Sequence, residues 1–156
     1  MGNDNTFPWI VLIIAPLGMI GVWLFVTRLL AALSGWSSLA ETYRGALTSI
    51  TASEPMASGR ISRFGIPINY NHVLSVAAGD EGVQLTLFRL LASGSPPLAI
   101  PWSHVADARN HRWLGMIDQF TFRPAQSRVK ITLTGRAARM LRDEAERRGH
   151  PVQGSA

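Results

Sequence analysis

The chain has 156 residues, a formal net charge of +5 and no cysteine. The lack of cysteine excludes a disulfide framework and a C-terminal lipid anchor, and it suits a reducing compartment. Beyond an apolar N-terminal region, about 100 residues remain, which is enough for one small domain with a single core.

Residues 7–27 form an uncharged, apolar segment of 21 residues. As a helix this segment is roughly 31 Å long at about 1.5 Å per residue, which matches the bilayer core of about 30 Å. It predicts a transmembrane helix over residues 7–33 after an extracytoplasmic tail, residues 1–6. A cleaved signal peptide and a buried core helix are the alternatives, but residues 1–6 hold Asp4 and no Lys or Arg.

Basic residues follow this segment and do not precede it. The positive-inside rule therefore predicts a single-pass protein of the inner (plasma) membrane, with its N-terminus outside and its C-terminal domain in the cytoplasm. Aromatic and basic residues at the two ends of the span are expected at the membrane interface: Trp9, Arg28, Trp36, Tyr43 and Arg44.

Residues 34–57 are predicted to form a juxtamembrane helix and a linker. Ser34-Gly35 ends the first helix, and Ser38 with Glu41 has the spacing of a capping box. A short amphipathic helix over residues 39–49 follows from this pattern, with a loop containing one helical turn as the alternative. The small polar residues 51–59 are interpreted as the linker.

Short alternating runs typical of strands begin at Arg60. Residues 73–91 predict a hairpin around the turn 78–82, and residues 120–135 predict another around 125–127. Further short strands are expected at 60–70, 98–102 and 104–113.

The chain then predicts a C-terminal amphipathic helix that starts after Thr134 as N-cap and ends before Gly149. Asp143 and Glu144 precede Arg147 and Arg148 by four residues each, a spacing that favours ion pairs along a helix. Residues 150–156 are expected to be a disordered tail. The fold class is thus α+β: one N-terminal transmembrane helix plus a small antiparallel β-barrel or roll closed by a C-terminal helix.

The stretch "PLAIPWSHVADAR" at residues 97–109 resembles a strand of pleckstrin-homology-like (PH-like) domains in small membrane-anchored bacterial proteins. The resemblance covers residues 58–149 and implies a bent antiparallel barrel with a closing helix. The resemblance implies that Arg60 and Arg63 would occupy places similar to the basic residues around the first hairpin of phosphoinositide-binding members. The closing helix lacks the Trp usual in eukaryotic members, and the chain lacks their Lys-rich signature.

The sequence offers little support for catalysis. His104, Asp107 and His111 are the nearest metal-ligand cluster, but positions 104 and 107 of a strand face opposite sides. No nucleophile elbow or phosphate loop is present. We therefore expect no metal, no cofactor, no small-molecule substrate and no enzymatic activity, while an enzyme using His104 and Asp107 stays formally open. Arginines near aromatics between 109 and 130 fit solvated strand faces better than a nucleic-acid site.

An apolar segment at residues 113–117 interrupts the polar pattern. It can dip into the membrane interface, dock on a partner or form a buried crossover.

The sequence therefore predicts a non-enzymatic membrane protein whose cytoplasmic domain is a binding or scaffolding module, an accessory subunit of a larger membrane complex. Its partners would be membrane lipids and other membrane subunits, without nucleic acid. The alternative is a peripheral sensor of anionic lipid headgroups that uses an Arg-rich face. The candidate partner or lipid contacts are Arg60, Arg63, Arg109, Arg112, Trp113, Leu114 and Met116.

Overall fold

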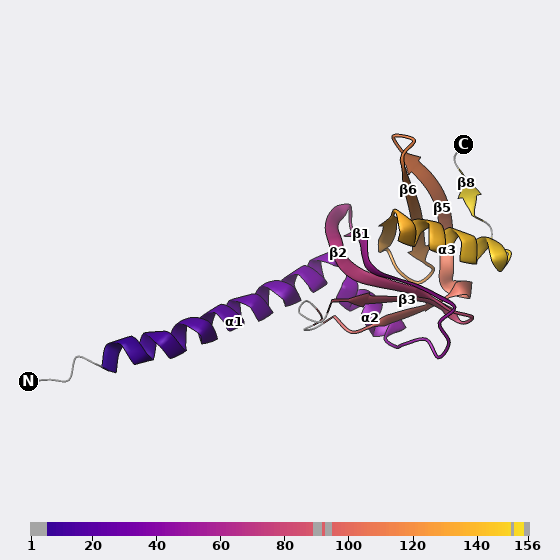
Figure 1. Cartoon of the computed structure of the whole chain (residues 1–156). Coiled ribbons are helices and arrows are strands. Elements are labelled where there is room, and N and C mark those ends of the chain that lie inside the picture. The colour runs from indigo at the N-terminus through magenta and orange to yellow at the C-terminus, as the bar shows by residue number, and fades with distance from the viewer. Residues whose placement is uncertain (1–5, 89–91, 93–94, 151, 155–156) are drawn as a thin grey trace, which may run out of the picture.

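A long N-terminal helix projects from a curled β-sheet in the computed structural model (Figure 1). The structure describes residues 6–88, 92, 95–150 and 152–154. Helix α1 (Thr6–Ser34) is followed by the short α2 (Trp36–Tyr43), and α3 (Arg136–Arg147) lies near the C-terminus. The strands are β1 (Ala52–Arg63), β2 (Ile66–Ala78), β3 (Gly82–Leu87), β4 (Leu98–Pro101), β5 (Val105–Trp113), β6 (Ile117–Pro124), β7 (Lys130–Thr134) and β8 (Gln153–Gly154), with a 3₁₀ turn, η1 (Trp102–His104), before β5.

The strands form one mixed sheet in the order β4-β3-β2-β1-β7-β6-β5-β8. The hairpins predicted around 78–82 and 125–127 are confirmed as the antiparallel pairs β2–β3 and β6–β7. β8 pairs in parallel with β5 at Arg109 and Asn110, so the prediction of a purely antiparallel sheet is corrected. Residues 153–154 belong to the tail that was expected to be disordered; in the structure they extend the sheet.

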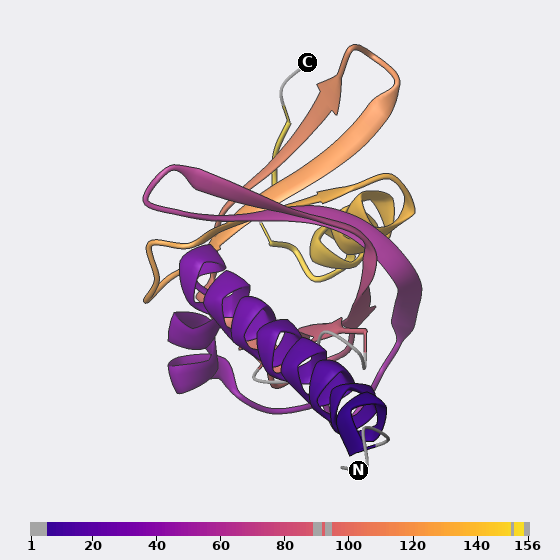
Figure 2. The same ribbon diagram turned by 90° about the vertical axis from the view of Figure 1, so that its left-hand side faces the viewer.

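Bulges bend this sheet into a half-barrel (Figure 2). The β1–β2 register shifts around Ala57, and the β5–β6 register shifts between Ala106 and Arg109. Met56, His72 and Asp107 lie at these irregular points with φ of 53°, 56° and 51°. An extra residue in one strand of a pair bends that strand and increases its twist, which explains the curl of the sheet.

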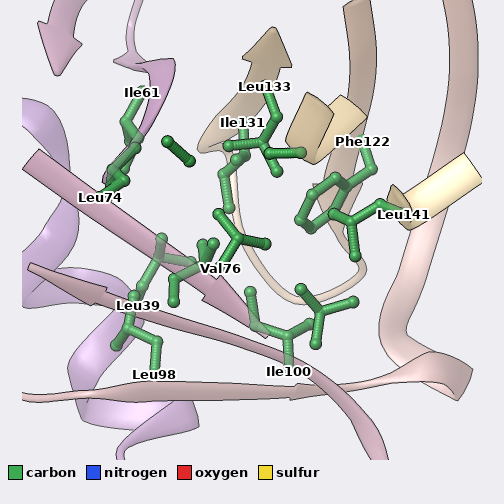
Figure 3. Packing of buried hydrophobic residues seen from close by; sticks show 14 of the residues in the cluster. Leu39, Ile61, Leu74, Val76, Leu98, Ile100, Phe122, Ile131, Leu133 and Leu141 are labelled. Atoms are coloured by element: carbon green, nitrogen blue, oxygen red, sulfur yellow. The ribbon is translucent and has the colours of Figure 1, made fainter. Parts of the chain in front are cut away.

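The core lies on the inner face of the half-barrel, and two helices cover its open side. Figure 3 shows Leu39 of α2 beside Leu98 of β4, and Leu141 of α3 beside Phe122 of β6. These four side chains are fully buried. Burying each large apolar side chain stabilises the fold by about 1.5–3 kcal/mol, so both helices are part of the domain.

The joint between α1 and α2 differs from the predicted capping box. The N-cap of α2 is Gly35, in the left-handed conformation with φ 85°, and it makes no side-chain cap hydrogen bond. Helix α2 begins at Trp36, so the prediction of a helix capped by Ser38 and Glu41 is wrong. Glycine adopts positive φ without steric cost, so the chain turns between the two helices at Gly35 without a side-chain cap.

Trp36 and Tyr43 lie inside the domain instead of at a membrane surface. Trp36 is fully buried, and its Nε1 donates a hydrogen bond to the Pro96 carbonyl at 3.0 Å. Tyr43 is 4% exposed and ends α2 six residues before the predicted end of the helix. Their prediction as interface residues is therefore corrected: both side chains belong to the apolar core.

Two further boundaries are corrected. Residues 52–59 form the first two thirds of β1, so they are not a linker. Thr134 does not cap α3, because its hydroxyl donates to the Ser58 carbonyl and Gly135 is the N-cap. The left-handed Gly149 after α3 is confirmed with φ 68°.

We predict that Gly35→Ala destabilises the protein by about 2 kcal/mol or more, because a left-handed alanine costs about 1–2 kcal/mol by itself. The added methyl group would also lie 2.6 Å from Cγ2 of Val129. Ser38→Ala should change the free energy of unfolding by less than about 0.5 kcal/mol. Denaturant unfolding in mild detergent, followed by near-ultraviolet circular dichroism, measures both. If Ser38→Ala lowered the free energy of unfolding by about 1 kcal/mol, the result would contradict this prediction and support a capping role for Ser38.

Candidate functional site

The surface of α1 is apolar and almost entirely uncovered. Its segment Val11–Ser34 is long and apolar enough to cross a membrane, and only 6% of its most apolar window is buried. This exposure contradicts the alternative of a buried core helix. By length and composition the segment fits either a membrane span or a signal sequence.

Only the last turns of α1 pack against the domain. Thr27, Ala31 and Ser34 are buried there, whereas Arg28 points to solvent. An apolar cleft of about 290 Å³ lies between this end of α1 and β2, lined in part by Leu30. Burial raises the pKa of Tyr70 in this cleft.

The hairpin of β5 and β6 ends in four exposed apolar side chains, which we call the apolar tip: Trp113, Leu114, Met116 and Ile117. Met116 is 79% exposed and Leu114 is 70% exposed. Leu114 and Gly115 form the turn with φ of 49° and 69°. A buried crossover at residues 113–117 is therefore ruled out, and the segment is free to contact a membrane or a partner.

The hairpin runs crosswise to α1. Figures 1 and 2 both show β5 and β6 projecting to the side of the domain, while α1 leaves it in another direction. A bilayer that surrounds α1 would therefore lie off to one side of the apolar tip.

An ion-pair cluster at Asp118, next to the apolar tip, holds this hairpin on α3. Arg139 Nη1 donates to one carboxylate oxygen of Asp118 at 3.0 Å, and Arg112 Nε donates to the other at 3.3 Å. The hydrogen bond from Arg139, together with Arg112, lowers the pKa of Asp118 although partial burial opposes this. Arg112, predicted as a ligand contact, is thus engaged in fixing the hairpin.

The outer face of the sheet carries a polar groove of about 730 Å³. One row of paired residues crosses its floor: Arg60 of β1 opposite Thr132 of β7, Thr132 opposite Thr121 of β6, and Thr121 opposite Arg109 of β5. Lys130 of β7 also lines it. These side chains face outward because they alternate with buried neighbours along each strand.

The groove is strongly basic. Arg123 also lines it and is 3.7 Å from Asp107, whose side chain is the only carboxylate among the described lining residues. Arg60 Nε donates to the neutral Asn69 side chain at 2.8 Å. Arg109 and Lys130 make no ion pair with any carboxylate that the structure describes. The groove therefore presents cations whose charge is not compensated.

The structure brings some predicted contact residues together and separates others. Arg60 and Arg109 line the same groove, but Arg63 lies 4.9 Å from the ring centre of Phe64 at the β1–β2 turn. Arg44 is exposed and its backbone bridges Leu98. Trp9 lies on α1, but its side chain is outside the part of the chain that the structure describes.

Sequence reasoning did not include Lys130, Arg123, Phe64 and Ile66 among the contact residues. Phe64 and Ile66 are 69% and 56% exposed at the β1–β2 turn, which forms a second apolar hairpin end. The sequence shows Phe64 and Ile66 on either side of Gly65, a turn signal. It does not show that Arg123 and Lys130 share a groove with Arg60 and Arg109, because that depends on the order of the strands in the sheet.

His104 and Asp107, the candidate catalytic residues, each contact a different neighbour in the structure. The ring centres of His104 and Tyr43 are 5.7 Å apart in an edge-to-face contact, whereas the carboxylate of Asp107 lies beside the guanidinium of Arg123. Within the described residues, no three His, Asp or Glu side chains gather as metal ligands. Trp102, the Trp of the "IPW" motif, donates from Nε1 to the Gly79 carbonyl at 2.9 Å and so fixes the β2–β3 turn.

The comparison with known proteins adds no relative. No family model matches the chain, and no curated protein sequence is significantly similar to it. Function is therefore argued from three surfaces: uncovered α1, the apolar tip and the basic groove.

We predict that Asp118→Asn destabilises the protein at pH 7 and makes its stability less sensitive to acid. The pKa of Asp118 is lower in the folded than in the unfolded chain, so its contribution is present above about pH 4 and is lost as pH falls through the folded pKa. Denaturant unfolding of both proteins between pH 7 and pH 2 measures this. Asp143→Asn is the control, since Asp143 is exposed and, among the described residues, pairs only with Arg142. Parallel pH profiles for the wild type and Asp118→Asn would contradict the prediction.

Proposed function

We propose that this chain is a non-enzymatic, membrane-anchored binding module that acts as an accessory subunit of a membrane protein complex. In this proposal α1 crosses the membrane with its N-terminus outside, and the β domain lies at the cytoplasmic surface. The apolar tip then contacts a neighbouring subunit.

The exposure of the apolar tip is the observation that carries the proposal. Four large apolar side chains at one hairpin end contribute nothing to the core, and water contact with them is unfavourable. The Asp118 ion pairs hold this hairpin on α3, so the tip is presented in a defined direction. A preorganised apolar surface loses little conformational entropy when it docks, which suits a protein contact.

The packing of α1 supports the anchoring part of the proposal. Its last turns are buried in the domain and lead through Gly35 to the buried Trp36. A membrane span joined to the core in this way would hold the β domain in a definite orientation to the bilayer. The half-barrel with its C-terminal helix also agrees in outline with a PH-like domain, and that family assignment remains part of the proposal.

We predict that the mature protein keeps its N-terminal helix. Intact mass spectrometry of membrane-extracted protein should give about the full 17.0 kDa. A chain shortened near residue 30 would identify the segment as a cleaved signal sequence and contradict anchoring. Because Thr27, Ala31 and Ser34 pack in the domain, such cleavage should also lower the stability of the product.

We further predict that a photo-crosslinking residue at position 114 or 116 of the full chain, in its native membrane, forms a discrete adduct with one membrane protein. The control is the same residue at position 146, which is exposed at the other end of α3, where Arg148 pairs with Asp80 after β2. Trp113→Ser with Ile117→Ser should reduce the position 116 adduct about tenfold, because apolar contact is lost. Adducts with lipid alone, or equal adducts at position 146, would contradict the proposed docking surface.

The contribution of the span is tested separately by replacing residues 7–26 with a generic apolar helix. Residues 27–34 are kept, because Thr27, Ala31 and Ser34 among them pack against the domain. If the adduct disappears, the natural span contacts the partner as well. If the adduct stays, the apolar tip is sufficient for binding.

A further inference from the structure

We propose that the basic groove on the outer face of β1, β7, β6 and β5 binds an extended acidic peptide segment of another protein. The groove is separate from the apolar tip, so this proposal does not depend on the proposed function. It also assigns a ligand class to a face that folding leaves exposed.

Unpaired charge is the first argument. Arg109 and Lys130 have no carboxylate partner among the described residues, and Arg60 is held only by a neutral amide. Side chains of like charge on one face repel one another, and an anionic ligand relieves that repulsion. Carboxylates also accept the several hydrogen bonds that each guanidinium donates.

The spacing of the cations is the second argument. Arg60 and Arg109 are separated by three strand-to-strand steps, about 14 Å at about 4.8 Å per step. Lys130 lies two residues along β7 from Thr132 in that row, a shift of about 7 Å. In an extended peptide, side chains two residues apart are about 7 Å apart and those four apart about 13 Å. Acidic residues at alternate positions therefore match these cation spacings.

The floor between the cations is polar. The hydroxyls of Thr121 and Thr132 are 3.0 Å apart and share a hydrogen bond at its centre. Hydroxyl groups both donate and accept, so they can pair with the backbone of a bound strand. The side chain of Phe122, which also lines the groove, is fully buried beneath the floor, so it offers no aromatic surface to a ligand.

Two other polyanions fit the groove less well. Proteins that bind single-stranded nucleic acid combine a basic groove with exposed aromatic rings, and the described lining residues include no exposed Phe, Tyr or Trp. Lipid headgroups would surround α1, whereas strands β5 and β6 of the groove run crosswise to it (Figure 2). An acidic protein segment beside the domain matches the position of the groove best.

The test measures peptide binding to the full chain in nanodiscs of zwitterionic phosphatidylcholine. The probe is a fluorescent peptide that alternates glutamate and serine over nine residues, followed by anisotropy. We expect binding that weakens as salt increases, and no binding of the matched peptide with glutamine in place of glutamate.

Two double variants with equal loss of charge locate the site. Arg109→Gln with Lys130→Gln removes two groove cations and should weaken binding about tenfold. Arg128→Gln with Arg136→Gln removes two exposed cations outside the groove lining and should weaken binding less than about twofold. All four side chains are exposed, and equal unfolding midpoints for the two double variants verify that both are folded.

Several outcomes would overturn the proposal. Equal weakening by the two double variants would show general electrostatic attraction instead of a site. Binding of phosphatidylglycerol vesicles or of an oligothymidine that depends on Arg109 and Lys130, without peptide binding, would assign the groove to lipid or nucleic acid. The absence of binding to any of these probes would also reject it.

Discussion

The open side of the half-barrel is the constraint on which the rest of this structure depends. A sheet that curls without closing leaves its apolar inner face in contact with water unless other elements cover it. Here α3 covers one part, and α2 with the end of α1 covers another. The exposed N-terminal helix is consequently continuous with the core, through one left-handed glycine at position 35.

Alternation along the strands assigns the two faces of the sheet to different tasks. In β1 the buried Ile61 follows the exposed Arg60, and in β7 the buried Ile131 follows the exposed Lys130. The same period of two that fills the core therefore builds the basic groove on the outside. A register slip of one residue would exchange the faces, so core packing also fixes the position of the groove cations.

The turns of the β1–β2 and β5–β6 hairpins place apolar residues in an unfavourable backbone conformation. Phe64 and Leu114 adopt left-handed backbone conformations and are exposed, at positions where asparagine, aspartate or glycine is favoured. Each conformation costs about 1–2 kcal/mol, and neither side chain gains burial within the chain. Apolar residues retained at such a cost point to contacts made outside the chain, which agrees with docking at the apolar tip.

Local patterns in the sequence were sufficient to determine α1, the two central hairpins, α3 and its left-handed Gly149, because periodicity and turn residues act over a few neighbours. They could not place Trp36 and Tyr43, since an aromatic residue after an apolar helix suits a membrane interface and a core equally well. The tertiary structure places both side chains in the core, because the turn at Gly35 directs α2 against the open side of the half-barrel. It also decided the groove: Arg60 and Arg109 are distant in sequence and line one groove because β7 and β6 join their strands. Which residues share the groove depends on the order of strands that are far apart in sequence, and no local pattern in the chain shows that order.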